Sequence, residues 1–182
     1  VIGLVEVMKP FLEVKSDSSV KLVKFLIEYE GEVADLNRKP LTAALLAGLL
    51  RASRGDVNMV SAPLQAANRG IKISRTTQAK TGVFDGYVKL TVKTPSKERS
   101  IAGTVFSDGK PRFIQIKGIN IDAEVGAHML YTTNHDEPGI IGTLGVTMGE
   151  NGVNIANFTL GRSDRGKDAI ALLYLDDQPE AA

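Results

Sequence analysis

The chain has 182 residues, of which 43% are hydrophobic and 24% charged, as in an ordinary soluble globular protein with one large or two small domains. The absence of Cys excludes disulfides, thiolate catalysis and Cys-ligated metals, and two His residues leave little for a metal cluster. The low aromatic content of 5% argues against a nucleic-acid platform built on stacked rings. Since the chain has neither a run of about 18 apolar residues nor a signal-peptide pattern, we expect no membrane span and a cytoplasmic location.

The net charge of +1 is unevenly distributed along the chain. Residues 69–117 carry 11 basic and 3 acidic side chains, whereas residues 118–182 carry 3 basic and 10 acidic ones. This change predicts a domain boundary, with one domain over 1–118 and a second over 119–182; solvated surface charge without a special role is the alternative. Because the first residue is Val rather than Met, we expect the chain to be part of a longer protein.

The first 30 residues predict a helix and a strand. Ile2–Phe11 has the pattern of a helix. Over Val20–Glu30, polar side chains alternate with Phe25, Ile27 and Tyr29, which predicts a strand with one buried face.

Two further helices are predicted next. Pro40–Arg51 has a proline at its start and is rich in strong helix formers. It is apolar on nearly all sides, so we expect it to be buried. A second helix is predicted over Asn58–Asn68, with Asn58 as its N-cap and Gly70 at its end.

The rest of the first domain favours strands, the last two of which are joined by a hairpin turn with Asp-Gly at its centre. The predicted fold class is therefore α+β, with helices on one face of a mostly antiparallel sheet. The predicted strands are Ile71–Gln78, Gly82–Thr94, Ser100–Phe106 and Arg112–Ile116.

The second domain has the order strand, helix, strand, strand. This order corresponds to the first two-thirds of a ferredoxin-like fold, whose second helix and last strand are not visible in the sequence. We therefore expect the domain to be incomplete at its C-terminus. The four predicted elements are His128–Thr133, Ile140–Glu150, Asn154–Gly161 and Lys167–Leu175.

A polar turn between the first strand and the helix of the second domain is a candidate ligand site. Pro138 at a first helical position and Gly139 beside it leave backbone N–H donors that suit a carboxylate. Asp136 could accept from a ligand ammonium, and Asn154 offers a donor and an acceptor to the same region. Together these groups suit a zwitterion such as an amino acid. Alternatively, Asp136 is the N-cap of the helix and Asn154 satisfies a turn.

No catalytic or metal-binding motif was found. The sequence lacks GxGxxG, GxxxxGK[ST], HExxH and GxSxG patterns. Asp136 and Glu137 are adjacent, so their side chains are not expected to converge on one point. His128 and His135 have no neighbouring nucleophile in the sequence. We therefore expect neither catalytic residues nor a metal.

Several separate blocks resemble the long form of the D-3-phosphoglycerate dehydrogenase family. The D-x-P-G turn at Asp136–Gly139 and the G-V-N-I sequence at Gly152–Ile155 resemble the start of an ACT domain, an amino-acid-sensing module. Other blocks resemble the intervening domain of these enzymes: Tyr29–Asn37, Pro40–Ala44, Val57–Val60, Ala102–Phe106 and Ile114–Ile119.

The resemblance implies a regulatory and assembly role. In this family the ACT domain binds L-serine between paired ACT domains, which implies a homo-oligomer, either a dimer or a tetramer. Asp136 would hold the ammonium group, the backbone of the turn the carboxylate, and Asn154 the other polar groups. The residues that the resemblance assigns to L-serine are Asn134, Asp136, Pro138, Gly139, Ile140 and Asn154.

The resemblance also implies an anionic phospho-ligand in the intervening domain, with Arg112, Lys117, Lys89 and Lys93 as candidates. The parent enzyme would oxidise 3-phosphoglycerate with NAD in L-serine biosynthesis. Its NAD fold and catalytic residues would lie upstream, so no cofactor is expected in this chain. Three alternatives remain: an assembly module that binds no ligand, a subunit that acts with an upstream catalytic chain, and a nucleic-acid binder using 69–117.

Overall fold

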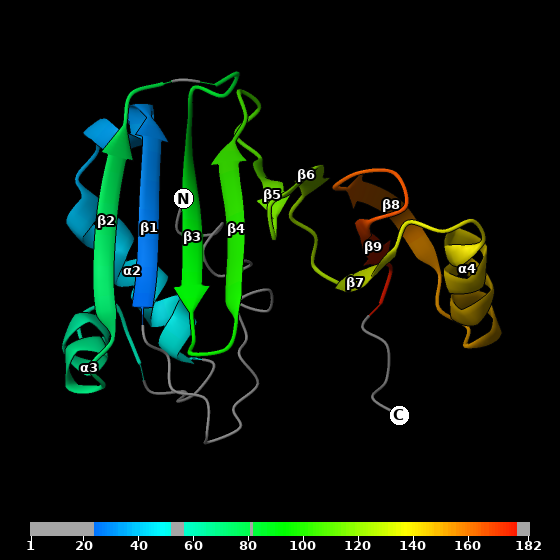
Figure 1. Cartoon of the computed structure of the whole chain (residues 1–182), viewed down its shortest axis with the longest axis horizontal. Helices are drawn as coiled ribbons and strands as arrows, with labels where there is room; N and C mark the ends of the chain where they lie inside the picture. The colour runs from blue at the N-terminus through cyan, green and yellow to red at the C-terminus, as the bar shows by residue number, and fades with distance from the viewer. Residues whose placement is uncertain (1–23, 52–56, 81, 178–182) are drawn as a thin grey trace.

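The structure is a computed structural model that describes residues 24–51, 57–80 and 82–177. These residues form a six-stranded sheet with two helices and a three-stranded sheet with one helix (Figure 1). The expected helix over Ile2–Phe11 lies outside the described residues. The elements of the first part are β1 (Lys24–Gly31), the 3-10 helix η1 (Glu32–Asp35), α2 (Arg38–Arg51), α3 (Ala62–Asn68), β2 (Lys72–Gln78), β3 (Gly86–Lys93), β4 (Glu98–Val105), β5 (Pro111–Ile116) and β6 (Ile119–Glu124).

The larger sheet has the strand order β2-β1-β3-β4-β5-β6. All neighbouring strands are antiparallel except β1 and β2, which are parallel and are connected through α2 and α3. A mixed α+β fold with a mostly antiparallel sheet is therefore confirmed. The parallel pair was not predicted, because nothing in the pattern of Ile71–Gln78 indicates its direction.

The core of this sheet lies between β1 and α2. Phe25, Ile27 and Tyr29 are fully buried, as the alternation predicts. They share one hydrophobic cluster with Leu45 and Leu46 of α2. Each such side chain contributes about 1.5–3 kcal/mol on burial, so this contact fixes α2 against the sheet.

Helix α3 begins later than predicted. The side-chain oxygen of Asn58 accepts hydrogen bonds from the backbone N–H groups of Val60 and Ser61, both at 2.9 Å. These are the bonds that an N-cap residue makes, as predicted for Asn58, and the Ala62 N–H donates to the Asn58 carbonyl at 2.9 Å. The regular helix nevertheless begins only at Ala62. Its end agrees with the prediction, since the Gly70 N–H donates to the Ala67 carbonyl at 2.9 Å.

Two hairpin turns follow β4 and β5. The predicted Asp108-Gly109 turn is confirmed: the Phe106 N–H donates to the Lys110 carbonyl at 3.0 Å. A second hairpin, which was not predicted, turns at Lys117 and Gly118, both with positive φ, as a two-residue type I′ turn requires. It adds β6, so the larger sheet continues to Glu124.

The smaller sheet has the strand order β7-β9-β8. One face of β9 packs with Leu144 and Met148 of its helix, while Ile170 and Leu172 on the other face join the core of the larger sheet. The central strand of the smaller sheet, β9, is thus buried on both of its faces. Its elements, in the expected order, are β7 (Met129–His135), α4 (Ile140–Glu150), β8 (Ile155–Arg162) and β9 (Asp168–Leu175).

No helix among the described residues has the length and apolar content needed to span a membrane.

Candidate functional site

The predicted ligand turn joins the end of β7 to the start of α4. Pro138 lies in the turn and not at a first helical position, because α4 begins at Ile140 and Gly139 is its N-cap with φ 94°. No side chain caps the helix. The first N–H groups of α4 are therefore donors without an intrahelical acceptor.

Asp136 is held by the turn between β8 and β9. Its Oδ2 accepts hydrogen bonds from Arg162 Nη1 at 3.0 Å and from the Gly166 N–H at 3.2 Å. The bond from Gly166, followed by that from Arg162, lowers the pKa of Asp136 and keeps this carboxylate ionised. The carboxylate therefore fixes the turn after β8 and does not cap α4.

Asn134 and Asn154 lie at opposite ends of the smaller sheet. Asn134 donates to the His135 carbonyl at 2.6 Å, and His135 pairs with Asp168 at the start of β9. Asn154 donates to Asp176 Oδ2 at 2.6 Å, just beyond the end of β9. Eight residues of strand separate the two ends, a distance of roughly 27 Å. Asn154 and the turn therefore do not meet within one chain.

A cavity of about 420 Å³ separates the β5–β6 turn from the ends of β7 and β9. It brings together Lys117 and Asn134, which the sequence assigned to two different ligands, with His135 and Asp168. The Lys117 ammonium lies 5.6 Å from the centre of the Tyr131 ring. Burial, and then the nearby charges of Arg99 and Lys97, lower the pKa of Lys117.

The four predicted anion-binding side chains do not converge. Arg112 is surrounded by carboxylates, with Glu124 at 2.8 Å and Asp122 at 3.2 Å. The hydrogen bond to Asp122 raises the pKa of Arg112.

The two lysines of β3 also have different neighbours. Lys93 pairs with Glu98 at 2.5 Å, and Lys89 lies opposite Glu28 in the β1–β3 register.

The partners of Asp136 and Arg112 were missed by the sequence analysis. Arg162 and Gly166 are far from Asp136 in sequence, so no local pattern reveals them. Asp122 and Glu124 could have been found, since Ile119–Glu124 alternates apolar and polar residues as a half-buried strand does. In the described part of the chain, no group of three or more His, Asp or Glu side chains could hold a metal ion.

The chain matches a family model, described as the D-3-phosphoglycerate dehydrogenase intervening domain, over residues 1–117. It belongs to the D-3-phosphoglycerate dehydrogenase family. Similar relatives, all D-3-phosphoglycerate dehydrogenases, occur in Synechocystis sp. (36% identity over 150 residues, 81% of this chain and 27% of the relative) and Bacillus subtilis (34% over 152, 82% and 29%). Another, in Archaeoglobus fulgidus, is 31% identical over 179 residues, covering 97% of this chain and 33% of the relative.

The chain thus spans about a third or less of the length of these D-3-phosphoglycerate dehydrogenases. The family model covers β1 to β5, whereas the Archaeoglobus match extends over nearly the whole chain. Similarity to the D-3-phosphoglycerate dehydrogenase family is therefore not restricted to the larger sheet.

Proposed function

We propose that this chain is the regulatory and assembly part of an NAD-dependent D-3-phosphoglycerate dehydrogenase of L-serine biosynthesis. In this proposal the larger sheet is the intervening domain, and the smaller sheet with α4 is an ACT-like, partial ferredoxin-like domain. The order β7-α4-β8-β9, with β9 between the other two strands, supports the second assignment. Oxidation of 3-phosphoglycerate would belong to another part of the parent enzyme.

The observation that carries a regulatory role is the separation of Asp136 from Asn154 along one sheet. If two copies pair through β8 in antiparallel fashion about a two-fold axis, the Asn154 end of one copy meets the turn of the other. Each of two equivalent sites would then combine Asp136 and the start of α4 from one copy with Asn154 from its partner. Such a site exists only in the assembled state, so its ligand would stabilise that state.

The surface around α4 and β8 supports this pairing. No residue of α4 is fully buried, although the helix is largely apolar. Ile141, Val146 and Leu160 are among the exposed large hydrophobic side chains. A second copy would cover apolar surface that α4 and β8 now leave in water.

L-Serine suits the proposed shared site. The N–H groups of the first turn of α4 would bind its carboxylate. The ionised Asp136 would attract its ammonium group, and Asn154 of the second copy would bind its hydroxyl. The Arg162 guanidinium partly neutralises Asp136, which predicts moderate rather than tight binding.

Mixing two inactive variants tests the shared site. Asp136→Ala and Asn154→Ala should each lose serine binding by about tenfold or more in isothermal titration. A mixture exchanged into heterodimers should regain one site of every two, because one copy supplies an intact Asp136 and the other an intact Asn154. If the mixture forms heterodimers but binds serine as weakly as either variant alone, the proposal is contradicted.

A purely structural assembly module is the second candidate. It is favoured by the hydrogen bonds that Asp136 already makes within its own chain to Arg162 and Gly166. In that case sedimentation would detect the dimer, but serine would change neither the dimerisation constant nor the heat of titration. A serine-dependent increase in dimerisation excludes this candidate.

We further infer that an anionic effector would bind at Lys117. Two nearby cations, Arg99 and Lys97, raise the positive potential at Lys117 and are opposed by the one carboxylate of Asp168. Arg112 and Lys93, in contrast, are paired with carboxylates. Inorganic phosphate is the probe: Lys117→Gln should weaken its binding, and Lys72→Gln, on the exposed strand β2, should not. Equal phosphate binding by both variants would exclude this site.

A further inference from the structure

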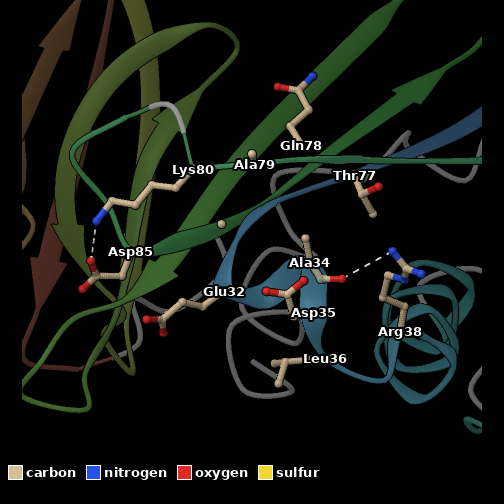
Figure 2. Close-up of a pocket in the computed structure, with 11 residues that line it drawn as sticks. Glu32, Ala34, Asp35, Leu36, Arg38, Thr77, Gln78, Ala79, Lys80 and Asp85 are labelled. Carbon is tan, nitrogen blue, oxygen red and sulfur yellow. Dashed lines mark hydrogen bonds and ion pairs between the residues drawn. The ribbon is translucent and has the colours of Figure 1, made fainter.

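A crevice of about 730 Å³ lies at the carboxyl ends of the parallel strands β1 and β2 (Figure 2). Ligands of α/β folds bind outside the carboxyl ends of parallel strands, where the following loops diverge. After β1 the crevice is lined by η1 and the start of α2, and after β2 by Ala79, Lys80 and Asp85.

Two carboxylates of the crevice share one face of η1. A 3-10 helix has three residues per turn, so the side chains of Glu32 and Asp35 lie in one row. Neither forms an ion pair in the described part of the chain. A third carboxylate, Asp85, is paired with Lys80 at 2.6 Å. The lining therefore presents more negative charge than its lysine neutralises.

A cation lies on the opposite side of the crevice. Figure 2 shows Arg38 on the other side of the crevice from the Lys80–Asp85 pair. Its guanidinium donates one hydrogen bond, from Nη1 to the Ala34 carbonyl at 3.3 Å. Arg38 is also the first residue of α2, where the helix dipole disfavours a positive charge and attracts an anion. This end of the crevice suits a carboxylate.

We propose that the crevice binds a small basic amino acid. The charged lining side chains are three carboxylates and two cations, a net charge of −1, which complements a ligand of net charge +1. The ligand carboxylate binds the Arg38 guanidinium, and its amino groups bind Asp35 and Glu32. Gln78 lies above these carboxylates in Figure 2 and is a neutral donor and acceptor. This inference is independent of the serine site on the smaller sheet.

The probe is L-lysine, titrated into the 182-residue chain at constant ionic strength and followed by ¹H–¹⁵N spectra. The crevice is open to solvent, so we expect a Kd of about 1 mM, with saturable shifts at Gly31, Asp35 and Gln78 and none along α4. L-Norleucine lacks the second amine and 1,5-diaminopentane lacks the carboxylate, so each should bind more weakly. Equal shifts with all three compounds, or shifts that do not saturate, would overturn the proposal.

Charge-removing variants test the assignment of the two ends. Asp35→Asn and Arg38→Gln are exposed substitutions, and each should weaken L-lysine binding by about fivefold. Glu150→Gln, at the exposed end of α4, makes the same kind of change away from the crevice and should leave binding unaltered. L-Lysine binding that resists both crevice substitutions, or that Glu150→Gln weakens equally, would also overturn the proposal. Shifts at the crevice amides, without shifts along α4, test this proposal separately from the serine site.

Discussion

Gly161 lies directly against the backbone of Asn120, where β8 contacts β6. A Cβ atom on Gly161 would come within 2.6 Å of the Asn120 carbonyl oxygen and 3.0 Å of an Ile119 methyl carbon. These atoms belong to the larger sheet, so the two sheets approach each other at this point more closely than any other residue type would allow.

Replacing Gly161 by Ala should therefore destabilise the contact between the two sheets. The nearest atom is backbone and cannot turn aside as a flexible side chain would, so we expect a loss of about 1–3 kcal/mol of unfolding free energy. Urea denaturation measures it. Gly142→Ala is the matched control, since a Cβ there meets nothing within 4 Å and lies inside α4, where Ala stabilises by up to about 1 kcal/mol. A destabilised Gly142→Ala or a neutral Gly161→Ala would contradict this account.

Tyr87→Phe should destabilise the larger sheet. The Tyr87 hydroxyl donates to Glu30 Oε2 at 2.7 Å, and Glu30 is 95% buried, with an exposed fraction of 5%. Removing this donor from a buried carboxylate costs about 1–3 kcal/mol. The cost should fall when Glu30→Gln is already present, which a double-mutant cycle in urea measures; full additivity would exclude the coupling.

The Tyr87 hydroxyl should also make the folded state less stable at alkaline pH. Burial, and then the bond to Glu30, raise the pKa of Tyr87 to about 12 from the ordinary value of 10.0. A group with a raised pKa in the folded state contributes stability below pH 10, which is lost as the pH rises towards 12. Wild type should lose stability in this window faster than Tyr87→Phe. Parallel stability curves between pH 10 and 12 would argue against the raised pKa.

Asp136→Asn should lower stability at neutral pH but not in acid. The pKa of Asp136 is lowered in the folded state, so its contribution is present above the ordinary value of 3.8. It is lost as the pH falls through the folded-state pKa. Urea midpoints of wild type and Asp136→Asn should therefore differ at pH 7 and converge in acid, below the ordinary value of 3.8.

Glu137→Gln is the neighbouring control for Asp136. The Glu137 side chain makes no hydrogen bond or ion pair within the described residues, so its replacement should leave the urea midpoint at pH 7 unchanged. A pH-independent difference between wild type and Asp136→Asn would indicate lost packing rather than lost charge.

Local patterns predicted the elements whose own residues carry a clear signal. The alternation of Phe25, Ile27 and Tyr29 located β1, and the helix formers after Pro40 located α2. The predicted bounds of the helix Ile140–Glu150 agree with the structure. In each case the signal lies within a few residues, where side-chain periodicity or turn preference decides the backbone conformation.

Features that depend on distant partners could not be predicted in this way. β6 follows a turn with Lys117 at φ 51°, a conformation that lysine seldom adopts and that no turn motif indicates. The carboxylates beside Arg112 and the bond from Arg162 to Asp136 depend on strand register. The family resemblance located the turn, but the roughly 27 Å between Asn134 and Asn154 follows only from the pairing of β7 and β8 with β9.

The position of β1 between β2 and β3 has a consequence for folding kinetics. β1 pairs with β3 and with β2, and every residue of both partners lies more than 40 positions further along the chain, whereas β3 to β6 are joined by short hairpins. Hairpins close within microseconds, but β1 must wait until a long segment containing α2 and α3 has been ordered. Mutations in β1 are therefore expected to slow folding if its docking limits the rate, and until then β2 and β3 each present an unpaired edge to other chains.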